Sequence, residues 1–124
     1  MISKDLTLYK KSFAFAVRIV GLHRLLVERK KEFVLSKQCL RSGTSIGANI
    51  AEANGAISSS DFSSKISIAY KESLETKYWL SLLRETGYLS ERGCLSLHKD
   101  ADELSKILFS ILRTVRLKGI PRPH

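Results

Sequence analysis

Proline is absent from the first 120 residues of the chain, and the two prolines, Pro121 and Pro123, stand near its end. Proline disrupts the interior of a helix, and the proline-free part is rich in Leu, Ala, Lys and Glu, which favour helices. The 124 residues are enough for one hydrophobic core without disulfides or a structural metal. The chain is therefore expected to form a single all-α domain over residues 1–124.

Apolar residues recur three and four positions apart along four segments, which is the spacing of one face of a helix. Asn54-Gly55 is typical of a helix C-terminus, Ser58 and Asp61 have the spacing of a capping box, and Gly87 stops the third segment. Short turns between the segments predict an antiparallel up-down-up-down four-helix bundle. The expected helices cover residues 3–29, 34–53, 60–86 and 90–117, and residues 118–124 form a short tail.

The break between the first two segments, Arg29-Lys30-Lys31-Glu32, contains neither glycine nor proline. An unbroken helix from residue 3 to residue 54 would be about 75–80 Å long, which is too long for a domain of this size. The apolar spacing also changes phase here, and positive charge suits the C-terminal end of a helix. A short turn is therefore expected at residues 29–33.

Two apolar stripes run side by side along the first segment. One stripe holds Leu6, Tyr9, Phe13, Ala16, Val20 and Val27, and the other holds Leu8, Phe15, Ile19, Leu22 and Leu26. A surface helix of a monomer needs only about one third of its circumference to be apolar. The excess predicts that this helix packs against another subunit as well as against its own core, so a homo-oligomer is expected.

Polar side chains repeat along one side of the second segment, and a second polar set lies on the third. The six positions are Arg41, Ser45, Asn49, Glu52, Glu72 and Glu75. Spacings of three and four put the members of each set on one side of a helix. We interpret them as a structural polar network, in which Arg41 clamps one of the two last glutamates and Asn49 fixes the helix register. Simple exposure on the surface is the alternative.

Gly43 and Gly47 lie inside the second segment, where glycine lowers helix propensity. The stretch superficially resembles a phosphate loop, but it lacks the GxxxxGK[ST] pattern and a preceding strand. Close contact with another helix is the expected reason for both glycines.

No catalytic or metal-binding arrangement is expected. His23, His98 and His124 are scattered along the chain, and the Glu-x-x-His motif of di-iron bundles does not occur. Cys39 and Cys94 have neither metal-site spacing nor a CxxC motif. We expect a non-enzymatic protein without a cofactor or small-molecule substrate. Reduced cysteines and the lack of a signal peptide or membrane span favour a cytoplasmic location away from the membrane.

The formal net charge is +9, and the excess of basic residues lies in the first and last segments. Residues 1–31 hold eight Lys/Arg and two acidic residues, and residues 90–124 hold seven and four. Because the two chain ends of such a bundle lie at the same end, two basic clusters are expected. One would contain Lys4, Lys10, Lys11, Arg113, Arg116, Lys118 and Arg122, and the other, at the opposite end, Arg24, Arg29, Lys30 and Lys31. Such clusters favour a polyanionic partner, although a basic surface can also serve solubility alone.

Several stretches carry a resemblance to a known family. The second segment reads Gln38-x-x-Arg41-Ser42-x-x-Ser45-Ile46-x-x-Asn49-Ile50-Ala51-Glu52, and the third contains Asp61-Phe62, Ile68-Ala69-x-Lys71-Glu72-Ser73-x-Glu75-Thr76 and Tyr78-Trp79-Leu80. On these residues the chain resembles the four-helix-bundle family of bacterial 23S rRNA intervening-sequence proteins, over nearly its whole length. It departs from the family at residues 29–33, which lack a frequent proline, and at Ala53-Asn54, where Glu-Gly is more usual.

The resemblance implies a homopentamer without an established enzymatic activity, and some members are encoded within insertions in large-subunit ribosomal RNA genes. A distant relative, the accessory protein of diversity-generating retroelements, uses a basic surface to bind reverse transcriptase and nucleic acid. Together with the charge, this predicts an oligomer that binds nucleic acid, RNA rather than DNA, or a nucleoprotein. The alternative is a protein–protein adaptor for an acidic partner such as a reverse transcriptase.

Overall fold

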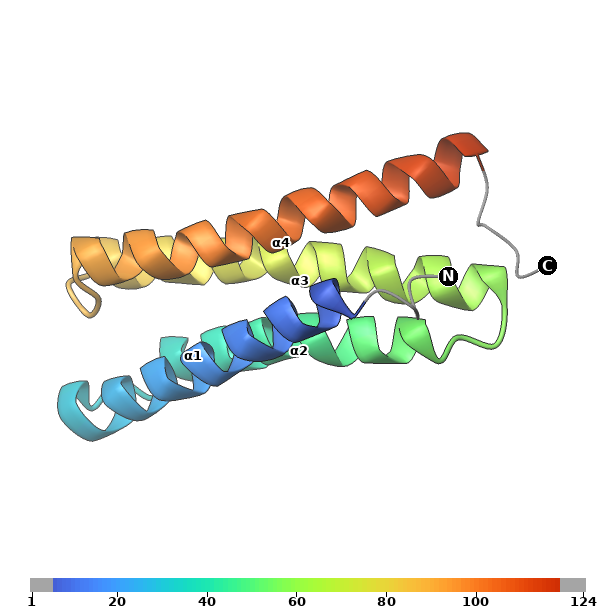
Figure 1. The fold of residues 1–124 in the computed structure, drawn as a ribbon. Coiled ribbons are helices and arrows are strands. Elements are labelled where there is room, and N and C mark those ends of the chain that lie inside the picture. Colours follow the sequence, from blue (N-terminus) through green and yellow to red (C-terminus); the bar gives the residue numbers. More distant parts are fainter. Residues whose placement is uncertain (1–5, 119–124) are drawn as a thin grey trace.

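The computed structural model describes residues 6–118, which form four helices and no strand. The helices are α1 (Thr7–Lys30), α2 (Leu35–Asn54), α3 (Ser59–Glu85) and α4 (Glu91–Lys118). Consecutive helices run in opposite directions and pack side by side, and α4 returns to α1 (Figure 1). The predicted all-α four-helix bundle is therefore confirmed.

The observed ends of α2, α3 and α4 differ by one residue from the expected ranges 34–53, 60–86 and 90–117. The first helix begins at Thr7 with Leu6 before it, so its expected start at residue 3 lies outside the described residues. Ser58 accepts a hydrogen bond from the backbone N–H of Asp61 at 3.0 Å, which caps α3 as the spacing of these two residues indicates.

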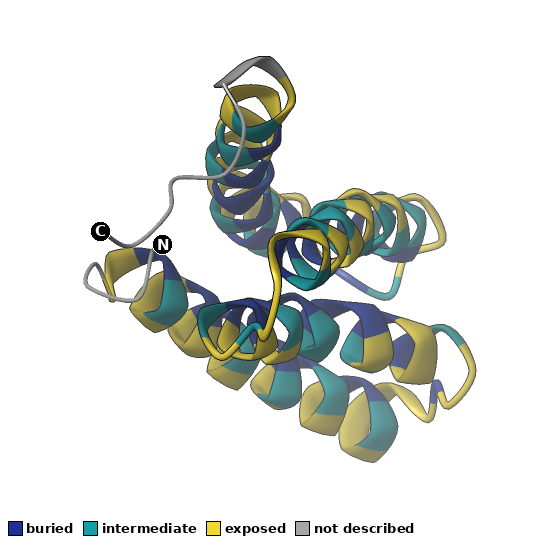
Figure 2. Cartoon of the chain, turned by 90° about the vertical axis from the view of Figure 1, so that its right-hand side faces the viewer, coloured by how far each residue is buried: buried dark blue, intermediate teal, exposed yellow. Residues whose placement is uncertain are grey.

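The core runs along one face of each helix (Figure 2). On α3 the buried residues are those of a single heptad-phased stripe, namely Phe62, Ile66, Ala69, Ser73, Thr76, Leu80 and Leu83. On α1 the buried stripe contains Leu8, Phe15, Ile19, Leu22 and Leu26 together with Ser12. The other α1 stripe turns outward, and Phe13 in it is 57% exposed. Tyr9, Ala16, Val20 and Val27 of this stripe are half-buried, so the subunit leaves part of the apolar surface of α1 uncovered.

On two helices the buried face is not a simple apolar stripe. On α2, Leu35 and Asn49 are only half-buried, whereas Ser36 and Ile50 lie in the core. On α4, Ile111 and Val115 are half-buried, because α1 and α4 share the smallest of the four interfaces between neighbouring helices and leave this end of α4 less covered.

The corner between α1 and α2 is closed by a carboxylate. Lys31 has left-handed backbone angles, φ 54° and ψ 32°, which end α1 without a glycine. The Glu32 side chain then accepts hydrogen bonds from the backbone N–H groups of Val34, Leu35 and Ser36 at 3.2, 3.2 and 2.7 Å. These are three of the donors that the first turn of α2 would otherwise leave unpaired. The turn occupies residues 31–34, which overlaps the expected range 29–33 and ends one residue beyond it.

Gly43 and Gly47 allow α1 to approach α2 closely. A Cβ atom on Gly43 would lie 2.9 Å from both γ carbons of Ile19, which is buried in the core. A Cβ atom on Gly47 would lie 3.2 Å from the Ser12 hydroxyl oxygen. The distance at Gly43 leaves no room for a methyl group unless Ile19 or the helices shift. At Gly47, Ser12 would have to move by only a few tenths of an ångström.

Two alanine substitutions are expected to change stability in opposite directions. Gly43→Ala gains helix propensity but forces apart the packed contact with Ile19, so the free energy of unfolding should fall by about 1–2 kcal/mol. Gly21→Ala should raise it by about 0.5–1 kcal/mol, because nothing lies within 4 Å of the added methyl group. Urea titration followed by circular dichroism measures both values. A stabilising Gly43→Ala would contradict the close contact.

Candidate nucleic-acid interface

The last two turns of α1 and the residue after it carry four basic side chains, Arg24, Arg29, Lys30 and Lys31, here called the corner cluster. All four are exposed, and none has a carboxylate within ion-pair distance among residues 6–118. Glu32 follows them directly, but its carboxylate is turned inward onto the start of α2. The corner cluster is therefore a group of positive charges without an ion-pair partner in the described part of the chain, although the exposed Glu28 lies in the same stretch.

The second expected cluster is only partly visible. Lys10, Lys11, Arg113 and Arg116 are exposed on α1 and α4, and we call them the terminal cluster. Lys4 and Arg122 lie outside the described residues, as does the side chain of Lys118. The start of α1 and the end of α4 do lie at the same end of the bundle (Figure 1).

The two halves of the terminal cluster do not form one compact patch as expected. The Lys11 ammonium group pairs with Glu103 at 3.3 Å. Arg113 lies ten residues beyond Glu103, which is about 15 Å further along α4. In this direction α4 also extends beyond the start of α1 (Figure 1). The stagger between α1 and α4 therefore separates Lys10 and Lys11 from the two arginines.

Ion pairs along the α1–α4 seam neutralise the middle of α1. Arg18 donates to Asp100 at 2.6 Å and to the hydroxyl of Ser96 at 2.8 Å, and Lys11 pairs with Glu103 nearby. These groups are about half exposed, so the pairs contribute little to stability. They affect the distribution of charge instead. Three of the four acidic residues of α4 lie in this region, so unpaired positive charge remains mainly at the two ends of the bundle.

The six residues of the expected polar network lie in three separate sets. Arg41 donates to Glu72 at 3.0 Å and also pairs with Glu75, which joins α2 to α3. Glu75 additionally accepts a hydrogen bond from the indole N–H of Trp79 at 2.9 Å. Glu72 is largely buried while Arg41 is half exposed, so the clamp sits at the edge of the core.

The other three residues of the network do not join that clamp. Asn49 donates to the backbone oxygen and the hydroxyl of Ser45 at 2.9 and 3.0 Å, both within α2. The prediction that Asn49 fixes the register between helices is therefore wrong, because an amide that bonds to its own helix does not restrain a neighbouring helix. Glu52 pairs with Lys65 of α3 at 3.0 Å, and this pairing raises the pKa of Lys65.

Buried hydroxyl pairs cross the core at positions where leucine would be expected. Thr76 of α3 donates to the Ser42 hydroxyl of α2 at 2.9 Å. Ser73 of α3 and Ser105 of α4 share a hydrogen bond of 2.7 Å. These four residues restrain helix register more directly than Asn49. The signal in the sequence was the presence of serine and threonine at core positions of facing helices.

The possible metal ligands of the described residues are dispersed, and the Cys39 thiol is buried. No three His, Cys, Asp or Glu side chains of residues 6–118 lie close enough to hold a metal ion. Cys39 is buried, and burial raises the pKa of its thiol to about 12, which makes it a packing group. Nor does any of the four helices, over the described part of the chain, have an apolar stretch sufficient to cross a bilayer.

Comparison with known proteins places the chain in a family. A family model described as 23S rRNA-intervening sequence protein matches residues 4–110. A crystal structure of a protein of unknown function from the S23 ribosomal protein family of Bacteroides thetaiotaomicron is 53% identical, with a TM-score of 0.86. The match covers 87% of this chain and 100% of that chain. The comparison with curated proteins found no match. Because the family model covers most of its length, the chain belongs to the 23S rRNA-intervening sequence protein family.

Proposed function

We propose that the protein is a non-enzymatic, cytoplasmic oligomer that binds structured RNA or a ribonucleoprotein. The observation that carries the proposal is the corner cluster, whose four exposed cations have no carboxylate partner in the described part of the subunit. Each contact of a cation with a phosphate releases counterions, so such a cluster binds a polyanion with a strong dependence on salt.

The relatives support RNA as the polyanion. The family description refers to an intervening sequence of 23S ribosomal RNA, and the structural neighbour is assigned to a ribosomal protein family. A folded RNA presents phosphates at many spacings, which suits basic clusters at two separate ends of a bundle about 40 Å long. An acidic protein would meet the same cations, so it is the competing partner in the tests below.

An apolar face supports self-association, and we propose the homopentamer that the family resemblance implies. Phe13 and Val17 of α1 are 57% and 59% exposed. Beside them a groove of about 270 Å³ lies between α1 and α2, and small residues such as Gly47, Ala48 and Ala51 form its α2 side. An aromatic side chain from a second subunit would cover this face. Five subunits would also present five corner clusters to one RNA and increase its affinity through avidity.

Charge reversal at the corner cluster tests the RNA proposal. Arg29→Glu with Lys30→Glu should weaken filter binding to a structured ribosomal RNA fragment by about 10- to 100-fold near 0.1 M salt. The slope of log affinity against log salt should fall by about 1 for each phosphate that the variant no longer binds. The matched control is Lys71→Glu with Lys99→Glu, which changes the net charge equally at two exposed lysines outside the clusters.

An equal decrease of affinity in the two double variants would show a non-specific charge effect and contradict the assigned surface. Purification from the source cell with and without nuclease distinguishes the partner. A partner that nuclease removes supports RNA, and an acidic protein that stays bound after nuclease contradicts it.

A single glutamate on the apolar face tests the oligomer. Phe13→Glu should dissociate the assembly, because a carboxylate would be buried against apolar side chains without a partner. Light scattering coupled to size exclusion should then report the 13.9 kDa subunit in place of a pentamer of about 70 kDa. Leu95→Glu is the control, since Leu95 of α4 is 58% exposed and lies away from this face. Unchanged mass in Phe13→Glu would exclude the α1–α2 face as the subunit contact.

A further inference from the structure

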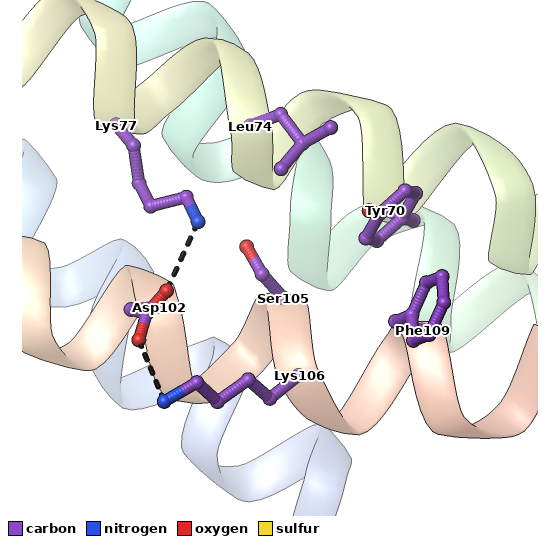
Figure 3. A pocket seen from close by; sticks show the side chains of 7 residues that line it. All are labelled: Tyr70, Leu74, Lys77, Asp102, Ser105, Lys106 and Phe109. Atoms are coloured by element: carbon purple, nitrogen blue, oxygen red, sulfur yellow. Dashed lines mark hydrogen bonds and ion pairs between the residues drawn. The ribbon is translucent and has the colours of Figure 1, made fainter.

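A shallow groove of about 320 Å³ lies between α3 and α4, on the side of the bundle away from the α1–α2 groove. It has two chemically different ends (Figure 3). Tyr70, Leu74 and Phe109 form an apolar end, and Lys77, Asp102 and Lys106 form a charged end. The groove thus places exposed apolar side chains beside two lysines that both pair with Asp102.

The apolar end presents an aromatic ring to solvent. Phe109 is 48% exposed, and its ring centroid lies 5.8 Å from that of Tyr70, with an angle of 44° between the rings. Leu74 is 41% exposed across the groove. The Tyr70 contact fixes one side of the Phe109 ring, and a planar group in the groove can stack on the side that remains open.

The charged end carries a net charge of +1. Asp102 accepts from the Lys77 and Lys106 ammonium groups at 3.1 Å each, and these hydrogen bonds lower the pKa of the Asp102 carboxyl. Asp102 therefore stays ionised and holds both ammonium groups beside the groove. The Lys106 side chain is 78% exposed, so its ammonium group can still reach an anion from outside.

The groove is continuous with the terminal cluster. Lys106 lies three residues before Phe109 and Arg113 lies four residues after it, so all three share one side of α4. Arg116 continues the same row three residues further on. Cations thus stand on both sides of the exposed ring along the helix, at spacings of about 5–6 Å between neighbouring side chains. Consecutive phosphates of an extended strand could contact both sides of the ring.

We propose that this groove binds one unpaired nucleobase of a single-stranded RNA segment. The base stacks on Phe109 between α3 and α4, and its flanking phosphates contact Lys106 and Arg113. A base within a duplex is excluded from such stacking, because both of its faces are already stacked. The inference rests on the proposed RNA binding and adds to it a preference for a single-stranded loop or end at the α3–α4 face.

A fluorescent base tests the groove. The probe is an oligouridylate of about 12 nucleotides with one central 2-aminopurine, whose emission falls when it stacks. Phe109→Leu keeps an apolar side chain but removes the stacking ring, so affinity should fall by about 5- to 100-fold and the quenching should disappear. Phe109→Trp should retain both, because a larger ring stacks at least as well. The control Tyr78→Leu alters another exposed aromatic residue, on α3 and outside the groove, and should have no effect.

Binding of other RNAs distinguishes a failure of the groove assignment from a failure of the proposed RNA binding. If Phe109→Leu leaves single-strand affinity and quenching unchanged while wild-type protein still binds structured RNA, the groove assignment is overturned and the RNA proposal stands. If wild-type protein binds neither RNA, both are overturned. Binding of a mononucleotide as tight as that of the oligonucleotide would contradict a strand and assign the groove to a free nucleotide. An equal decrease of duplex RNA binding in Phe109→Leu would contradict stacking of an unpaired base.

Discussion

The close contact of α1 with α2 at Gly43 determines much of the molecule. Ile19 fills the space that a side chain on Gly43 would occupy, and this fixes which face of α1 enters the core. The stripe through Phe13 is then left outside, next to a groove made by small residues of α2. The short turn at residues 31–34 places the end of α1 beside the start of α2, where Glu32 closes the corner and the basic residues before it are exposed. The candidate subunit contact therefore depends on the contact at Gly43.

The surface separates into regions with different physical properties. Acidic residues of α4 pair with Arg18 and Lys11 along the seam, so positive charge remains mainly at the two ends of the bundle. The α1–α2 side is apolar, and the α3–α4 side combines an exposed ring with lysines. An assembly that buries the first side leaves the other surfaces free for a polyanion.

The sequence predicted most strongly what depends on local pattern. The four helices followed directly from the spacing of apolar residues, and the Arg41 clamp followed from spacings that put it opposite Glu72 and Glu75. The sequence could not decide which α1 stripe is buried, because both are apolar and only the contact at Gly43 distinguishes them. The capping of α2 by Glu32 could not be predicted, because it depends on the left-handed backbone of Lys31, where the sequence has no glycine to indicate such a conformation. The pairing of Lys11 with Glu103 depends on the stagger of two helices that are far apart in the sequence.

The central claim is that RNA contacts the ends of the bundle and the outer side of α4. Ultraviolet cross-linking of the intact oligomer to structured RNA, followed by mass spectrometry of the nucleotide-bearing peptides, tests it most directly. We predict adducts on peptides that contain residues 24–31 and 106–116, and few on the stretch 37–57, which lies outside both basic regions. Adducts concentrated on residues 37–57, or distributed evenly over the surface, would contradict it.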